Sequence, residues 1–245
     1  MRIAVVSDIH GNLAALDAVL LDIERRGADR VVDLGDLLSG PLQPRETADR
    51  LIALGWPTIA GNHERQVLTD PPQRMGESDR FAAAQIRPDQ REWMRGLPAT
   101  LRLSDEVLLV HGTQRNDLEC FIETVDASGM RAATPDEAAE RAGDSDARVI
   151  LCGHTHVPRS LRLADGRLIV NPGSVGLQAY TGEHPYPHRV EVGTPQARYA
   201  IVERSGDGEW NAQLIAVDYD WNAAAELALR NGRPDWARAL ATGWV

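Results

Sequence analysis

Five short apolar runs, rich in β-branched residues, each end within two residues of a glycine, aspartate or histidine. They are Ile3–Val6, Arg30–Leu34, Pro57–Ala60, Val107–Val110 and Arg148–Leu151. Runs of this length with such exits are typical of buried strands. Leucines at helical spacing between the first two runs, closed by Gly27, predict a helix over Leu13–Arg26. Strand, helix and strand in succession form a βαβ unit with a parallel sheet, so the chain is predicted to be an α/β protein.

The rest of the chain is predicted to contain short helices, loops and strand pairs. The helical segments are Pro44–Leu54, residues 65–98 (with a break at Pro71-Pro72 and short helices at Phe81–Ile86 and Asp89–Arg95), the polar residues 114–146, and Trp221–Thr242. Hairpins are predicted for Leu161–Leu163 with Leu168–Val170 around Asp165-Gly166, and for Tyr199–Arg204 with Asn211–Val217 around Gly206-Asp207-Gly208. Residues 180–197 are predicted to form a loop. No linker or repeat interrupts this pattern, which indicates one domain over residues 1–245.

Composition excludes several classes of function. All 26 basic residues are arginine, so neither Schiff-base lysine chemistry nor a P-loop lysine is available. The net charge of −10 disfavours nucleic acid and anionic membrane surfaces as partners. No apolar run approaches the roughly 18 residues of a membrane span. The chain has two cysteines, Cys120 and Cys152, too few for a disulfide framework, and we expect a cytoplasmic protein.

Polar side chains of the kinds that bind metals follow every one of the five predicted strands. They are Asp8 and His10, then Asp36, then Asn62 and His63, then His111, and finally His154 and His156. The carboxyl ends of strands line the binding crevice in α/β sheets, so these residues are expected to converge. Two of the sets are i, i+2 pairs, whose side chains point to the same side if the backbone is extended. Each residue alone would be read as a turn, cap or packing residue, but their joint placement favours a site.

The motifs at these positions resemble those of a known family. DIH at 8–10, GD at 35–36, GNHE at 61–64, HG at 111–112 and GHTH at 153–156 resemble, in order, the five motifs of the calcineurin-like metallophosphoesterase superfamily. NPGSVG at 171–176 and the tail from residue 217 are similar to its small bacterial phosphodiesterase-like branch. The resemblance covers nearly the whole chain. It implies a four-layer αββα sandwich, in which two mixed sheets are flanked by helices.

By motif matching, the resemblance implies a dinuclear metal centre. Asp8, His10 and His156 would bind the first ion, Asn62, His111 and His154 the second, and Asp36 would bridge the two. Independently, a mixed set of oxygen and imidazole ligands suits Mn, Fe, Zn, Co or Ni, of which we favour Mn. Two dications and two carboxylates leave a charge of +2, which attracts phosphate. In such centres a shared water with a pKa of about 7 provides the bridging hydroxide that attacks phosphorus.

The residues after Gly61 are candidates for contact with the substrate. By the resemblance, His63 protonates the leaving-group oxygen as general acid, which is worth a factor of roughly 10²–10⁴. We expect Asn62, His63 and Arg65 to contact substrate, with Arg115 as the other arginine near a motif. For Glu64 two interpretations stay open: it orients the His63 ring, or it lies at the surface.

The sequence therefore predicts a hydrolase of small phosphoesters, and phosphodiesters are preferred as substrates. Protein phosphatases and dinucleoside tetraphosphatases of the family carry an arginine soon after GD, whereas GDLLSGP at 35–41 has none. A protein or nucleotide phosphatase is the alternative enzyme, and a non-catalytic protein-binding scaffold of the same fold is the alternative from another class. No membrane partner is expected, nucleic acid is disfavoured, and a homo-oligomer remains open. Residues 180–195 are long enough to narrow the site.

Overall fold

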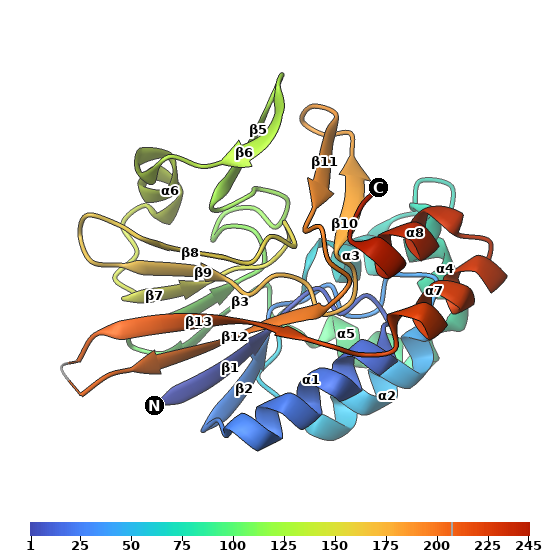
Figure 1. Cartoon of the computed structure of the whole chain (residues 1–245), viewed down its shortest axis with the longest axis horizontal. Coiled ribbons are helices and arrows are strands. Elements are labelled where there is room, and N and C mark those ends of the chain that lie inside the picture. The colour runs from blue at the N-terminus through green and yellow to red at the C-terminus, as the bar shows by residue number, and fades with distance from the viewer. Residues whose placement is uncertain (207) are drawn as a thin grey trace.

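Two packed β-sheets form the centre of the computed structural model, which describes residues 1–206 and 208–245 (Figure 1). The first sheet has the order β13-β12-β1-β2, built from Trp210–Val217, Ala197–Arg204, Arg2–Val6 and Arg30–Asp33. The second has the order β3-β4-β7-β9-β8, built from Thr100–Ser104, Val107–Val110, Val149–Leu151, Leu168–Asn171 and Arg159–Arg162. Both are mixed sheets, because β1 is parallel to β2 but antiparallel to β12, while β9 is parallel to β7 but antiparallel to β8.

Alternate residues of β1 explain why two sheets and two helix layers pack together. Ala4 and Val6 are buried against Leu16 of α1 (Leu13–Arg26), which lies beside α2 (Pro44–Leu54) on the outer face of the first sheet. Ile3 and Val5 point the other way and pack against the second sheet. The outer face of that sheet is covered by α6 (Pro135–Ala142). The order helix, sheet, sheet, helix confirms the predicted four-layer αββα fold.

The helical segments are close to those predicted, with one shift that matters for the site. Residues 62–95 form α3 (Asn62–Thr69), α4 (Glu77–Gln85) and α5 (Pro88–Arg95), and the tail forms α7 (Trp221–Arg230) and α8 (Pro234–Thr242). His63 therefore lies in the first turn of a helix, whereas the sequence predicts only that it follows a strand. Among the described residues, no helix is long and apolar enough to cross a bilayer.

The predicted third strand, Pro57–Ala60, was wrong. Thr58 makes only an isolated parallel bridge with Asp33, through bonds from Asp33 N to Pro57 O and from Ile59 N to Asp33 O. Ala60 N then bonds to Pro98 O and leaves the sheet. Pro57 has no N–H of its own to extend the ladder, which keeps the pairing to a single bridge.

Two segments predicted as helix and loop contain strands instead. Residues 114–146 include the hairpin of β5 (Glu123–Asp126) and β6 (Gly129–Ala132), and only α6 is helical there. Residues 180–197 include β11 (His188–Glu191), which pairs with β10 (Ala179–Gly182). Polar and proline-rich composition concealed both hairpins. The hairpins predicted at β8–β9 and β12–β13 are confirmed, although Asp207 of the second turn lies outside the described residues.

Candidate metal centre

Left-handed backbone conformations, rather than the alternation of side chains along a strand, set the direction of the candidate ligands. All five non-glycine residues with positive φ among those described are candidate ligands, with φ between 52° and 69°: Asp8, His10, Asp36, His154 and His156. Each left-handed residue of this kind costs about 1–3 kcal/mol and persists only where its surroundings hold it. The extended backbone predicted for the two i, i+2 pairs was therefore wrong. Tight left-handed turns at the strand ends bring these side chains together.

Close backbone contacts hold these turns, and glycines make them possible. A Cβ at Gly61 would lie 2.2 Å from Asp36 Oδ1, and one at Gly153 would lie 2.1 Å from Ser7 Oγ. The motif glycines at these positions are thus required by close approach between loops. Glycine is required at these two positions because any side chain would push apart the two loops that carry candidate ligands.

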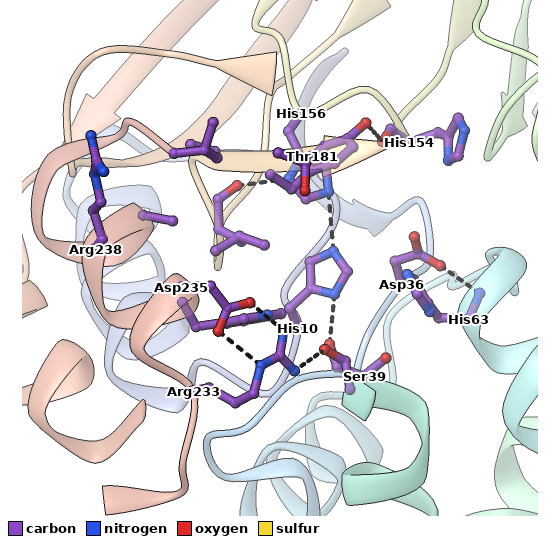
Figure 2. Close-up of a pocket in the computed structure, with 17 residues that line it drawn as sticks. His10, Asp36, Ser39, His63, His154, His156, Thr181, Arg233, Asp235 and Arg238 are labelled. Atoms are coloured by element: carbon purple, nitrogen blue, oxygen red, sulfur yellow. Dashed lines mark hydrogen bonds and ion pairs between the residues drawn. The ribbon is translucent and has the colours of Figure 1, made fainter. Parts of the chain in front are cut away.

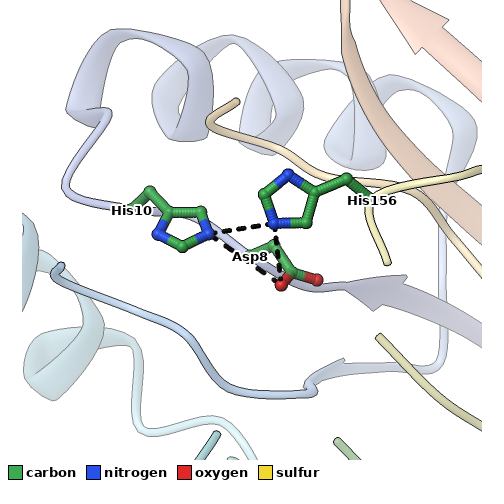
Figure 3. Close-up of side chains that lie close together, drawn as sticks. All are labelled: Asp8, His10 and His156. Carbon is green, nitrogen blue, oxygen red and sulfur yellow. Dashed lines mark hydrogen bonds and ion pairs between the residues drawn. The ribbon is translucent and has the colours of Figure 1, made fainter. Parts of the chain in front are cut away.

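The first cluster consists of Asp8, His10 and His156, all buried (Figure 3). Nδ1 of His10 bonds to Ser39 O and Nδ1 of His156 bonds to Leu177 O, each at 2.7 Å. These bonds place the ring protons on Nδ1, so the Nε2 lone pairs of the two rings face each other at 3.1 Å. Asp8 Oδ1 is buried without a hydrogen-bond partner and lies 3.2 Å from His156 Nε2. Three electron-pair donors that converge in this way fit a cation.

The second cluster consists of Asp36, His111 and His154, with Asn62 beside it. Nδ1 of His111 bonds to Leu34 O at 2.8 Å. Its Nε2 lies 3.0 Å from Asp36 Oδ2 and 3.1 Å from Asn62 Oδ1. The structure thus forms two candidate metal-binding triads, and the donor chemistry of both fits a divalent transition metal.

The electrostatics of the two clusters also favour cations. Burial, together with the charge of His156, lowers the pKa of His10 to about 4, and burial with the charge of His111 lowers that of His154 to about 4. Both rings are therefore neutral at neutral pH, as metal ligands must be. Burial would also lower the pKa of His111, but Asp36 outweighs it and raises this pKa to about 10. A positive charge is thus stabilised beside Asp36.

His63 lies at the edge of the centre, and its ring is held by a residue that the motifs did not reveal. Nδ1 of His63 bonds to Asp79 Oδ1 at 2.7 Å, and Ser39 Oγ donates to the same oxygen at 2.6 Å. Burial would lower the pKa of His63, but the charge of Asp36 and the bond to Asp79 raise it to about 9. Asp79 lies in α4, sixteen residues away, and nothing in the sequence distinguished it from an ordinary acidic residue near a helix start.

Glu64 has a role that neither interpretation anticipated. Its carboxylate is buried and accepts backbone N–H groups from Asp36 at 2.8 Å and from Leu37 and Gly61 at 2.9 Å. Burial and the charge of Asp36 raise its pKa. Glu64 thus ties the loop that carries Asp36 to the start of α3, and it does not contact the His63 ring.

A pocket of about 560 Å³ opens in front of the candidate ligands (Figure 2). His10, Asp36, His154, His156 and the candidate acid His63 line one side. The other side is lined by residues of β10 and α8 that sequence reasoning missed, because they are far from every motif: Ala179, Tyr180, Thr181, Asp235, Trp236, Arg238 and Ala239.

The arginines that the sequence suggested do not line this pocket. Arg65 makes a bidentate ion pair with Asp117, with N···O distances of 2.7 and 2.8 Å. Arg115 makes ion pairs with Glu119 and Glu140. The arginines that do line the pocket are Arg233 and Arg238. No sequence motif pointed to these two, because only the fold brings the tail to the metal ligands.

Comparison with known proteins agrees with the geometry. A family model described as the calcineurin-like phosphoesterase superfamily domain matches residues 1–192. The chain is 25% identical over 258 residues to the uncharacterised protein MJ0912 of Methanocaldococcus jannaschii, covering 96% of this chain and 94% of that protein.

Solved structures give the same result. The fold matches a metallophosphoesterase from Sphaerobacter thermophilus with a TM-score of 0.75 and 26% identity, covering 99% of this chain and 100% of the other. It also matches hypothetical protein PH1004 from Pyrococcus horikoshii OT3 with a TM-score of 0.74 and 18% identity, covering 99% and 98%, which shows the shared fold. The chain thus belongs to the calcineurin-like phosphoesterase superfamily of metallophosphoesterases, as its motifs predicted.

Proposed function

We propose that this protein is a hydrolase of small phosphodiesters that binds two divalent transition metal ions, with Mn²⁺ as the favoured metal. Asp8, His10 and His156 would hold one ion, Asn62, His111 and His154 the other, and Asp36 would be shared. The observation that carries the proposal is the pair of adjacent clusters whose imidazole Nε2 atoms and carboxylate oxygens converge beside His63. When bound, two such ions activate a water as nucleophile and stabilise negative charge on the phosphoryl oxygens.

The residues of the chain would supply the proton for the leaving group. Asp79 holds Nδ1 of His63, which leaves Nε2 as the nitrogen that donates. The pKa of about 9 keeps this ring protonated at neutral pH. Departure of an alkoxide without a proton is slow, so a positioned acid contributes roughly 10²–10⁴ in rate.

The preference for diesters is supported by the ion pairs that occupy the arginines near the candidate ligands. A monoester carries close to two negative charges at neutral pH and a diester one. Arg65 is occupied by Asp117, and Arg233 is occupied by Asp235 at 2.6 Å. These two arginines are thus not free to bind the additional charge of a monoester, whereas the pocket provides room for the second substituent of a diester.

The test is a comparison of two substrates with the same leaving group. We expect the Mn²⁺-loaded protein to hold two ions per chain and to hydrolyse methyl p-nitrophenyl phosphate with a higher kcat/KM than p-nitrophenyl phosphate. The reverse order would instead favour a protein or nucleotide phosphatase. Protein that neither binds metal nor hydrolyses either ester would favour the scaffold.

A further inference from the structure

The pocket extends well beyond the metal ligands, toward α8 and β10. Its volume of about 560 Å³ exceeds what a phosphoryl group needs, and it falls within the range of roughly 300–1,000 Å³ that is typical of small-molecule sites. Leu177, Ala179 and Ala239 make the walls of this extension apolar. Most of its far wall comes from α8, which lies outside residues 1–192 that the family model matches. The extension thus combines β10, which the family model matches, with α8, which it does not match.

Two aromatic side chains join the extension to the metal ligands. The ring of Tyr180 packs edge-on against that of His156, with centroids 4.8 Å apart, and the ring of Trp236 packs edge-on against that of His10 at 5.9 Å. Arg233 lies over the Trp236 ring at 5.7 Å, and its guanidinium is fixed by Asp235. These contacts hold an aromatic wall directly beside His10 and His156, and such a wall suits a flat organic group.

The far end of the extension carries an unpaired positive charge. Arg238 lines the pocket and is exposed, and within the described part of the chain its guanidinium makes no hydrogen bond or ion pair. Arg233, by contrast, is neutralised by Asp235. Arg238 is thus the pocket's available partner for an anionic group.

The position of His63 decides which part of a diester enters the extension. In Figure 2, His63 and Arg238 lie on opposite sides of His10. The leaving group must lie next to His63 to receive its proton. The substituent that stays on phosphorus must then point elsewhere, and the space on the other side of His10 is the extension.

We propose that this extension is the subsite for the substituent that stays on phosphorus. This substituent has the size of an aromatic ring and carries a carboxylate or phosphate that Arg238 binds. The inference rests on the proposed diester hydrolysis and adds the substrate class. It makes Tyr180, Thr181, Trp236 and Arg238 the residues that determine specificity.

The first experiment compares retained groups while the leaving group stays constant. We expect kcat/KM for phenyl p-nitrophenyl phosphate to exceed that for methyl p-nitrophenyl phosphate by about tenfold or more, after correction for their uncatalysed rates. In calorimetry on metal-loaded protein, phenylphosphonate, which cannot be hydrolysed, should bind about tenfold more tightly than methylphosphonate.

The blocking variant is Thr181→Trp. Thr181 is exposed on β10, so a larger side chain there can enter the pocket without disturbing the core. We expect Thr181→Trp to bring both phenyl-to-methyl ratios, that of kcat/KM and that of phosphonate binding, close to one. Thr181→Val, which keeps the volume, should retain both preferences.

The charge of Arg238 is tested with 4-carboxyphenylphosphonate against phenylphosphonate. We expect the carboxylate to tighten binding about fivefold or more, and Arg238→Gln to abolish that gain without changing phenylphosphonate binding. Arg230→Gln, an exposed arginine on α7 that does not line the pocket, is the matched control and should keep the gain. A gain that survives Arg238→Gln would overturn the role of Arg238.

Failure of the subsite and failure of the reaction give different results. Equal rates for phenyl and methyl diesters, with equal binding of the two phosphonates, would overturn the subsite. The proposed hydrolysis of diesters would be unaffected. Absence of hydrolysis for both diesters would overturn the proposed reaction, and a phenyl preference that persists in phosphonate binding and disappears in Thr181→Trp would still support the subsite.

Discussion

The metal centre and the wall formed by α8 and β10 face each other across one pocket, but they are held in different ways. The ligands lie on left-handed turns that are tied by buried hydrogen bonds, such as those from Ser174 Oγ to Asp8 O and from three N–H groups to Glu64. The wall is held by side-chain packing: Trp236 of α8 lies in an apolar cluster with Leu42, Leu177 and Leu240.

This difference assigns the chemical step to the metal centre and substrate selectivity to the wall. Buried hydrogen bonds hold the turns in the conformation that makes the donors converge, so substitutions there should remove the reaction itself. The wall depends on side-chain packing and exposed positions, which tolerate changes in size and charge. Substitutions there should change which substrate is used and leave the chemistry intact.

The largest effect is expected for Asp36→Asn. The charge of Asp36 acts on His10 and His154 as well as on His111 and His63, and so spans both clusters. Its removal should weaken both metal sites by more than the roughly 10–100-fold seen when a residue that only supports a ligand is changed. Metal content after dialysis, measured by plasma mass spectrometry, and turnover should fall together.

A matched control for this variant is Asp33→Asn. Asp33 is also buried, three residues earlier, but burial raises its pKa well above the usual value, so removal of its charge should matter less. Its Oδ1 accepts the N–H of Gly35, a bond that asparagine keeps. We expect normal metal content in Asp33→Asn, and normal content in Asp36→Asn would remove that residue from the centre.

His63→Ala should separate acid catalysis from metal binding. We expect the variant to keep two metals and to lose roughly two to four decades of turnover on alkyl diesters, whose leaving groups need a proton. On p-nitrophenyl esters the loss should be much smaller, because that anion leaves unaided. Equal losses with both kinds of leaving group would identify His63 as a structural residue or a ligand.

Asp79→Asn should have a smaller effect that depends on pH. The pKa of His63 is about 9 partly because Asp79 bonds to it, so the acid is protonated below that pH and is lost as pH rises through it. Without the charge of Asp79 this pKa falls, and the basic limb of the pH–rate profile should move to lower pH. At pH 7 we expect a loss of about tenfold or less on alkyl diesters. An unchanged basic limb would show that Asp79 does not act through His63.

The sequence predicted which side chains lie together better than the means by which they converge. The candidates after β1 and β2 belong to one sheet and those after β4 and β7 to the other, so the packing of the two sheets brings these strand ends near one another. Left-handed turns at Asp8 and His10 could not be read from local pattern, because positive φ at aspartate or histidine is imposed by surrounding loops.

The sequence could not predict the wall formed by α8 and β10, for a related reason. Trp236 lies far from every motif, and only tertiary packing of α8 against β10 brings it to His10. Thr181 lies in a segment whose proline-rich composition indicated a loop. Contacts of this kind depend on where whole elements dock, and neither periodicity nor motif spacing encodes that.

The smallest effect is expected for Arg65→Ala, although Arg65 lies next to the ligands in sequence. Its guanidinium is partly exposed, is occupied by Asp117 and does not line the pocket. An exposed ion pair of this kind contributes less than about 1 kcal/mol to stability, so the melting temperature should change little. Both kcat/KM values, for diester and for monoester, should stay within about twofold. A selective loss of monoester hydrolysis would instead show that Arg65 leaves Asp117 to bind phosphate, and selectivity would then also arise on the motif side of the pocket.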